Sequence, residues 1–507
     1  MNRRDFLTTS ASVMVGTALS GCASFGGSSG VPGDGDFLGV DATDLATLIR
    51  RGDVTPSELL EWSILRAEAV NPKLNALVIE HFDHARDRAA KGRLPKGPFR
   101  GVPFLLKDLG ITLEGTVTSH GSRFFKGAVA TGTSTLVERY EAAGLVIFGK
   151  TASPEFGSSS STESLAWGET HNPWQTEYSS GGSSGGSAAL VAAGVVPIAH
   201  ASDGGGSIRI PASCCGLFGL KPTRGLTPTG PNFFDKNAGL SINHAVSRTV
   251  RDSAALLDAT AGPAPFDPYL APAPERAYLD EVGRDPGSLL IGIQRRATLP
   301  TETHPDCLRA LDETAHLCES LGHRLEEIEP PPLPGAELWY TFGVMRGTSI
   351  AMLVQARERE LGRKATPDDL EPQNWSEYQR ALGYSAIDHE TQRQLVYRWA
   401  RDVVAHQSRF AAVLSPTLAG PPPKLGVLDP AHPDETFANA AMSMTGFTMA
   451  YNLSGQPAMS VPLDVNEGGL PIGSMFAGRL GGEGVLLRLA AQLEEAKPWR
   501  ARWPALV

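Results

Sequence analysis

Two glycine-rich turns separated by an apolar run constrain this chain more than any other part of its sequence. Residues 181–187 read Gly-Gly-Ser-Ser-Gly-Gly-Ser, residues 188–201 form the longest apolar run, and residues 203–207 read Asp-Gly-Gly-Gly-Ser. Because apolar sequence follows the first turn at once, the segment leads into a buried helix instead of a linker between domains. A glycine, a proline and a histidine interrupt the apolar run, which favours buried core over a membrane span.

The glycines of these turns point to anion or oxyanion binding, because residues without side chains let consecutive backbone N–H groups converge on one point. A phosphate-binding loop is disfavoured, since its pattern needs a lysine directly after the glycines and the next one is Lys221. The pattern Gly-x-Ser-x-Gly of a nucleophile elbow is present in residues 182–186, but residues 172–178 before it have the composition of a loop. An α/β-hydrolase-type esterase therefore remains an alternative.

Helix and strand signals alternate along most of the chain. Helices are predicted from a capping box at residues 55–58 and over residues 135–143 and 306–321, and strands over residues 102–106, 145–148, 195–199, 288–293 and 412–414. Helices that alternate with apolar strands predict an α/β protein: a single large α/β/α layered domain with a central mixed, largely parallel sheet.

Two proline-rich stretches, residues 330–334 and 421–423, bracket a segment of different character. Residues 335–410 are charged and helical in pattern, and we interpret them as a helical insert. Such an insert either covers a functional site or adds a further helical layer, and the sequence leaves both interpretations open.

The first residues have the pattern of an export signal. Arg3 and Arg4 precede Phe-Leu and a short apolar stretch, and Leu-Ser-Gly stands directly before Cys22. This predicts a twin-arginine-type signal peptide over residues 1–21, a lipidated flexible tether over residues 22–37 and a folded domain over residues 38–507. The expected location is the periplasm, where a lipid on Cys22 would anchor the protein to a membrane.

Charge and cysteine content exclude several classes of protein. Lys and Arg total 45 against 55 Asp and Glu, a net charge of −10, which disfavours nucleic acid as a partner. The cysteines at positions 22, 214, 215, 307 and 318 form no Cys-x-x-Cys pair, and the 12 histidines form no paired-ligand pattern. We predict neither a metal site nor any other cofactor.

The segment 179–225 resembles the signature of the amidase signature family of serine hydrolases, and the resemblance extends from about residue 40 to the end of the chain. Further matching motifs occur in family order at residues 101–108, 149–150, 154–157, 172–174, 247–252, 455–458 and 470–473. The resemblance implies the amidase signature fold for residues 38–507.

The family uses a Ser–cis-Ser–Lys triad, and each role has a matching position in this sequence. The resemblance implies that Ser207 is the nucleophile, that Ser183, preceded by a cis peptide bond, is the bridging serine, and that Lys107 is the base. A serine hydroxyl is a weak nucleophile and needs an adjacent base. Lysine must be neutral to act as one, and Lys107 ends an apolar strand, where burial would lower its pKa.

The turn around the nucleophile carries the remaining expected roles. The resemblance implies oxyanion donors on the backbone N–H groups of Gly204, Gly205, Gly206 and Ser207, and residues that hold the loop in place at Asp203, Arg209 and Ser184. Position 204 departs from the family, which usually has Thr or Ile there. The departure keeps the backbone donor but predicts a looser loop and an altered pocket shape.

The resemblance implies hydrolysis of a carboxylic amide C–N bond through an acyl-enzyme. Residues 166–168 and 69–72 look most like the 6-aminohexanoate cyclic-dimer hydrolase subgroup, and the expected substrate is a small, largely uncharged amide. A general aliphatic or aryl amidase is the alternative within the family, and a non-catalytic binding lipoprotein on the same fold is the alternative outside it. Homodimer formation is compatible with the sequence.

Overall fold

The computed structural model describes residues 37–91, 94–231, 235 and 237–506. The predicted signal peptide, Cys22 and all but the last residue of the tether lie outside the described residues. None of the described helices combines the length and the apolar character needed to cross a lipid bilayer.

Two β-sheets organise the molecule. The larger has eight strands in the order β10 (Arg324–Glu327), β9 (Leu290–Ile293), β11 (Ala412–Pro416), β13 (Pro471–Gly478), β12 (Ala458–Val465), β7 (Phe218–Lys221), β8 (Ile242–Ser247) and β6 (Ile198–Asp203). The smaller has the order β1 (Leu77–Glu80), β3 (Val146–Thr151) and β2 (Pro103–Lys107), and β4 (Glu163–Ser164) pairs with β5 (Gly168–Glu169). Strand β2 packs beside β6, the edge strand of the larger sheet.

The larger sheet is mixed, as predicted, but the expectation of a largely parallel sheet is wrong. Strand β9 pairs in parallel with β10 and β11, whereas the other five pairings between neighbouring strands of this sheet are antiparallel. One antiparallel pairing has a local cause, because two strands joined by a tight turn must run in opposite directions. Strands β12 and β13 are joined by such a turn, in which the carbonyl oxygen of Asn466 accepts a hydrogen bond from the Gly469 N–H. The other four antiparallel pairs are separated by 20 or more residues of chain, so their directions depend on where each connection returns to the sheet.

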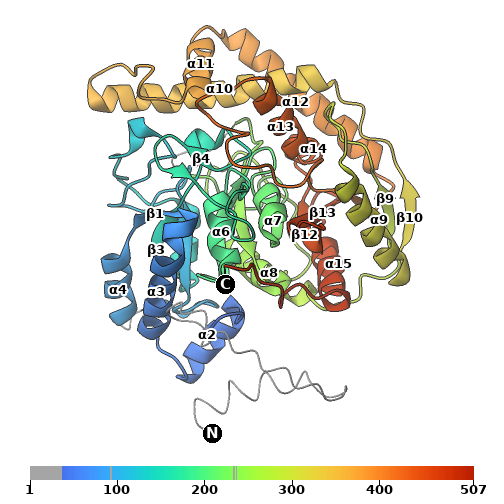
Figure 1. Cartoon of the computed structure of the whole chain (residues 1–507), viewed down its shortest axis with the longest axis horizontal. Helices are drawn as coiled ribbons and strands as arrows, with labels where there is room; N and C mark the ends of the chain where they lie inside the picture. Colours follow the sequence, from blue (N-terminus) through green and yellow to red (C-terminus); the bar gives the residue numbers. More distant parts are fainter. Residues whose placement is uncertain (1–36, 92–93, 232–234, 236, 507) are drawn as a thin grey trace.

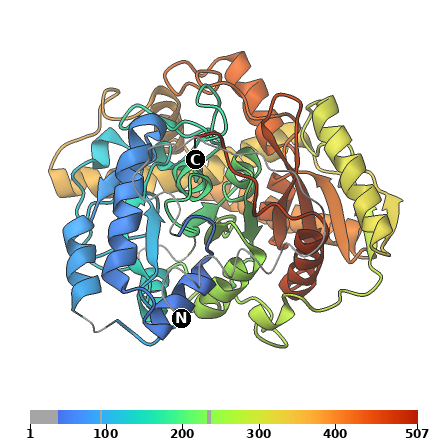
Figure 2. The same ribbon diagram turned by 60° about the horizontal axis from the view of Figure 1, so that its bottom comes forward.

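Helices cover both faces of the larger sheet and give the predicted α/β/α layers (Figures 1 and 2). Helices α6 (Gly185–Ala192) and α7 (Arg209–Cys215) pack on one face, and α8 (Val250–Thr260), α9 (Pro305–Ser320) and α15 (Glu483–Ala496) pack on the other. The smaller sheet is flanked by α3 (Pro56–Leu74), which begins at the predicted capping box of Thr55 and Glu58, and by α4 (Phe82–Ala90). Outside residues 335–410, the remaining described elements are α2 (Ala42–Arg51), α5 (Thr135–Ala142), α13 (Glu435–Thr445), α14 (Met449–Ser454) and the short 3-10 helices η1 (Arg123–Phe125), η2 (Glu155–Gly157) and η3 (Leu279–Glu281).

The segment between the proline-rich stretches contains three helices. These are α10 (Gly335–Leu361), α11 (Pro372–Ala381) and α12 (Ala386–Gln407). They lie together along one side of the molecule, at the top of Figure 1. Helix α12 packs against α14, which precedes β12.

Helix α6 is buried along its whole length, and its glycines let it approach the end of β3 closely. The Gly186 N–H donates a hydrogen bond to the carbonyl oxygen of Ala152. A Cβ atom on Gly186 would lie 2.4 Å from the backbone nitrogen of Ala152 and 2.8 Å from the carbonyl oxygen of Ala76. Only a residue without a side chain fits at position 186, which explains why a glycine stands at the start of this buried helix.

We expect Gly186→Ala to lower the free energy of unfolding by about 1–3 kcal/mol, because the new methyl group would push α6 away from rigid backbone. Gly127→Ala is the matched control, since no atom lies within 4 Å of a Cβ built there. Chemical denaturation of both variants measures the difference. Equal stability of the two would contradict this account of how α6 packs.

Candidate active site

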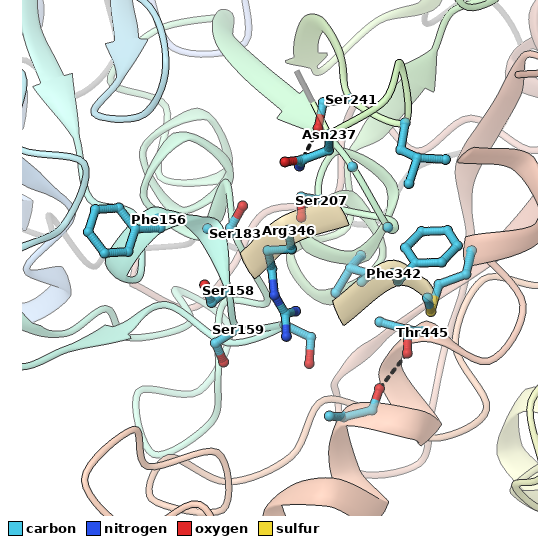
Figure 3. A pocket seen from close by; sticks show the side chains of 18 of the residues that line it. Phe156, Ser158, Ser159, Ser183, Ser207, Asn237, Ser241, Phe342, Arg346 and Thr445 are labelled. Atoms are coloured by element: carbon cyan, nitrogen blue, oxygen red, sulfur yellow. Dashed lines mark hydrogen bonds between the residues drawn. The ribbon is translucent and has the colours of Figure 1, made fainter. Parts of the chain in front are cut away.

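The described residues form a cavity where the two glycine-rich turns meet the helices of residues 335–407 (Figure 3). Serines dominate one wall, and aromatic and aliphatic side chains from α10, α13 and α14 form the other. The serines nearest the turns are Ser158, Ser159, Ser160, Ser183, Ser202 and Ser207.

Lys107 lies directly beneath this cavity, at the end of β2, and is completely buried. Its Nζ atom donates a hydrogen bond of 2.6 Å to Ser183 Oγ and one of 3.1 Å to Ser202 Oγ. Its backbone N–H donates to Nδ1 of His200 at 3.2 Å, which joins β2 to β6. The smaller sheet therefore supplies the lysine, and the neighbouring edge of the larger sheet fixes its position.

The first glycine-rich turn places Ser183 between Lys107 and the cavity. The peptide bond between Gly182 and Ser183 is cis. Ser184 stands just before α6, where its Oγ donates to the carbonyl oxygen of Ser202 at 3.2 Å and accepts from the Ser202 N–H at 3.3 Å. The turn is thus attached to β6, the strand that leads into the second turn.

Asp203 is the centre of the second turn. Its Oδ1 atom accepts hydrogen bonds from the Gly206 N–H at 2.7 Å and from Asn452 Nδ2 at 2.8 Å, and its Oδ2 accepts from the Ile208 N–H at 3.1 Å. Arg209 donates to both oxygens, at 2.9 and 3.0 Å. Burial acts to raise the pKa of Asp203, but Arg209, together with the smaller effects of Lys221 and Asn452, outweighs burial and lowers the pKa to about 2.

These contacts correct one expectation about the oxyanion donors. The Gly206 N–H points at Asp203 and is not available to a substrate. Gly204, Gly205 and Ser207 donate no backbone hydrogen bond to any described residue, and all three line the cavity. Gly206 has a φ of 138°, and a Cβ atom there would lie 2.4 Å from Oγ1 of Thr448, so its part is to let the chain turn.

The glycine at position 204 has a structural partner. A Cβ atom on Gly204 would lie 2.7 Å from Oγ of Ser241. Asn237 Nδ2 donates a hydrogen bond to this Oγ at 3.1 Å, and all three residues line the cavity. Ser241 therefore occupies the space that a larger side chain at 204 would need, which changes the lining of the cavity at this point.

Helix α11 is attached to the loop beside the cavity through buried carboxyl groups. Glu155 Oε2 accepts hydrogen bonds of 2.8 Å from the Glu371 N–H and from Asn374 Nδ2, and Glu371 Oε1 accepts from the Leu165 N–H at 2.9 Å. Burial and the nearby Glu155 raise the pKa of Glu371 to about 9. The neighbouring residues Phe156, Gly157, Ser158 and Ser159 all line the cavity.

Five residues from α10 and α11 reach the cavity: Trp339, Phe342, Gly343, Arg346 and Gln373. Arg346 forms an ion pair with Glu377 of α11, in which Nε donates to Oε2 at 2.9 Å and Nη2 donates to Oε1. Burial opposes the charge on Arg346, but Glu377 outweighs this effect and raises the pKa of Arg346 above its ordinary value.

The structure brings Lys107, Ser183, Ser207, Gly204 and Gly205 together, and Asp203, Arg209 and Ser184 hold the surrounding backbone. The sequence analysis missed Ser202, Asn452 and Arg346. Only Ser202 had a local signal, because it precedes Asp203 on a strand that ends at the site. No group of three His, Cys, Asp or Glu residues that could hold a metal ion occurs within the described ranges. Cys214, Cys215, Cys307 and Cys318 are buried free thiols.

Comparison with known proteins gives consistent results over nearly the whole chain. The sequence pattern of the family described as Amidase matches residues 58–487. The chain is 37% identical over 485 residues to the 6-aminohexanoate-cyclic-dimer hydrolase of Paenarthrobacter ureafaciens, covering 92% of this chain and 97% of that protein. It is also 37% identical over 477 residues to a putative amidase AmiC of Mycobacterium tuberculosis, covering 92% of this chain and 96% of the relative.

Solved structures agree with these sequence relatives. A 6-aminohexanoate cyclic dimer hydrolase complexed with substrate superimposes with a TM-score of 0.86 at 36% identity, covering 92% of this chain and 99% of the other. A bacterial aryl acylamidase of the amidase signature enzymes superimposes with a TM-score of 0.83 at 26% identity, covering 92% and 98%.

The Asp203–Arg209 pair generates a prediction about stability. We expect Arg209→Met to lower the free energy of unfolding by about 3–5 kcal/mol at pH 7.5, because it leaves a buried carboxylate without its partner. The loss should be smaller at pH 5, since without Arg209 the pKa of Asp203 rises and the group takes up a proton on folding.

In the wild type the pKa of Asp203 is lowered by folding, so its contribution is present above its unfolded value of 3.8 and is lost as the pH falls toward about 2. Urea denaturation at both pH values measures these changes. The double variant Asp203→Asn, Arg209→Met is the control, because it removes both charges and should be less destabilised at pH 7.5 than Arg209→Met. An equal loss for Arg209→Met at pH 5 and pH 7.5 would argue against an ionised Asp203.

Proposed function

This chain belongs to the amidase signature family and is a hydrolase of carbon–nitrogen amide bonds, and from that premise we propose that it acts through Ser207, Ser183 and Lys107 with an acyl-enzyme intermediate. The observation that carries the proposal is the 2.6 Å hydrogen bond between Lys107 Nζ and Ser183 Oγ. The bond lies at the floor of a cavity that both serines line.

The first half of the proposed reaction transfers the acyl group to Ser207. Neutral Lys107 takes a proton from Ser183 as Ser183 takes one from Ser207, whose Oγ attacks the amide carbonyl carbon. The backbone N–H groups of Gly204, Gly205 and Ser207 bind the negative charge that develops on the carbonyl oxygen. When the C–N bond breaks, the proton held by Lys107 passes back through Ser183 to the leaving nitrogen.

The second half releases the acid. Water takes the place of the amine, and Lys107 accepts its proton through Ser183 while the water oxygen attacks the ester carbon. The ester bond breaks, Ser207 regains a proton and the carboxylic acid leaves. Ser202 Oγ accepts a hydrogen bond of 3.1 Å from Lys107 Nζ, and this contact helps to keep the amine directed at Ser183 and not at the substrate.

The proposed substrate is a small amide of low charge, linear or cyclic. The relatives named above include a 6-aminohexanoate-cyclic-dimer hydrolase and an aryl acylamidase, and apolar side chains such as Phe342 and Met449 line the cavity of this chain. Helices α10 and α11 contribute to the same lining, so we propose that the segment 335–410 covers the site.

Replacement of the three proposed residues tests the mechanism. We expect Ser207→Ala to abolish amide hydrolysis, and Ser183→Ala and Lys107→Met to reduce kcat by about 10³-fold or more, because groups that act as a unit fail together. Ser320→Ala and Lys91→Met, which change exposed residues, are the matched controls and should keep wild-type rates. Initial rates on an anilide and melting temperatures are measured for every variant.

Fluorophosphonate labelling identifies the nucleophile independently of any substrate. Peptide mapping should place the adduct on Ser207. An adduct on Ser184 would favour a nucleophile elbow, and no adduct together with no turnover would favour a binding protein.

We also propose that residues 1–21 direct export by the twin-arginine route and that Cys22 carries a lipid anchor, on the basis of the sequence pattern alone. In a bacterial host, Cys22→Ser should shift the protein from the membrane to the soluble fraction, and Arg3→Lys with Arg4→Lys should retain it in the cytosol. Mass spectrometry of the amino-terminal peptide measures the modification. Unmodified protein that begins at Met1 would overturn this part of the proposal and leave the catalytic part unchanged.

A further inference from the structure

Arg346 is the charged residue of the cavity. Among the described residues that line it, all others are apolar, hydroxyl-bearing, amide-bearing or glycine. The residue comes from α10, and Figure 3 shows its side chain extending from that helix into the space that Ser183 and Ser207 also line. The proposed triad does not use it.

Glu377 occupies one edge of the guanidinium group. It accepts hydrogen bonds from Nε, at 2.9 Å, and from Nη2. Within the part of the chain that the structure describes, Nη1 of Arg346 has no hydrogen-bond partner. The side chain of Glu377 is only 6% exposed, whereas that of Arg346 is 29% exposed. The ion pair therefore keeps one edge of the guanidinium buried and leaves donors directed at the cavity.

The charge of this arrangement determines what it can bind. Arg346 and Glu377 together are neutral. Arg346 would attract a substrate carboxylate, but Glu377 would repel it. A neutral carbonyl oxygen accepts a hydrogen bond from a guanidinium N–H without adding charge to a buried pair. The lining of the same cavity includes the apolar side chains of Phe342, Trp339 and Met449, which suits a hydrocarbon chain that leads to such a carbonyl.

We propose that Arg346 binds a second, neutral hydrogen-bond acceptor on the substrate and that Glu377, by compensating its charge, excludes carboxylates from that position. The preferred substrates are then amides whose acyl chain carries a further amide or ester carbonyl. This inference rests on the proposed function, because it assigns the selectivity of the same cavity.

A purely structural role is the rival explanation. The ion pair also connects α10 to α11, and a group that did no more than this would affect every substrate to the same extent when replaced. The test must therefore compare substrates that share one scissile bond and differ only at the far end of the acyl chain.

The experiment uses three series of p-nitroanilides whose acyl chains end in a methyl group, a carboxamide or a carboxylate, each over several chain lengths. For the wild type at the optimal length, kcat/KM should be about 10- to 100-fold higher for the carboxamide than for the methyl compound, the size expected for a hydrogen bond to a charged donor. The carboxylate should be the poorest of the three.

Two substitutions separate the roles of the pair. Arg346→Met should remove the preference for the carboxamide, so that the ratio of kcat/KM for the carboxamide to kcat/KM for the methyl compound falls by about 10-fold or more. Glu377→Gln should raise kcat/KM for the carboxylate relative to the carboxamide by about 10-fold or more, because the guanidinium charge is no longer compensated. Arg359→Met, an exposed charge on the same helix, is the control and should change none of these ratios.

The outcomes distinguish this inference from the proposed function. Two outcomes overturn the inference alone. In the first, all three series are turned over and Arg346→Met leaves the ratios of kcat/KM between them unchanged. In the second, Arg346→Met lowers kcat/KM equally for all three series. No turnover of any anilide, with no label on Ser207, contradicts the proposed function instead. If Arg346→Met does not fold, two other measurements decide the question. One is the carboxamide preference of Arg346→Lys, and the other is the ratio of kcat/KM for the carboxylate to kcat/KM for the carboxamide in Glu377→Gln.

Discussion

The buried carboxylate of Asp203 is the constraint on which the site depends. It lies where β6 ends, and it accepts hydrogen bonds from the second turn, from Arg209 at the start of α7 and from Asn452 of α14. A buried charge is stable only when such partners surround it. The requirement fixes the path of the backbone through residues 203–209, and so determines which N–H groups are taken up by Asp203 and which are not.

The site forms at a junction between two sheets. Lys107 belongs to the smaller sheet, whereas Ser202 and the turn that bears Ser207 belong to the edge of the larger one. Ser183 lies between them, two residues before helix α6, which its glycines allow to pack against the end of β3. Each of the three stretches is held by backbone contacts of its own, so the side chains that meet in the cavity are positioned before any substrate arrives.

The sequence predicted the features that are local and missed those that depend on distant contacts. The buried helix after Ser184, the turn after Asp203 and the lysine at a strand end all follow from short patterns. The direction of most strands does not, because it depends on how each connection returns to the sheet. The oxyanion role expected for the Gly206 N–H was wrong for the same reason. Nothing in the sequence of residues 203–207 shows that the carboxylate of Asp203 accepts a hydrogen bond from this N–H.

The helices that bear Arg346 and Glu377 lie along one side of the molecule and contribute residues such as Phe342 and Gln373 to the cavity wall. In the proposed function, the catalytic residues and one part of the cavity wall are thereby encoded by separate stretches of the gene. Under this proposal, we expect recombination or mutation confined to residues 335–410 to change which compounds the cavity accepts while leaving the proposed catalytic residues in place. A scaffold divided in this way is suited to rapid adaptation when unfamiliar amides enter the environment.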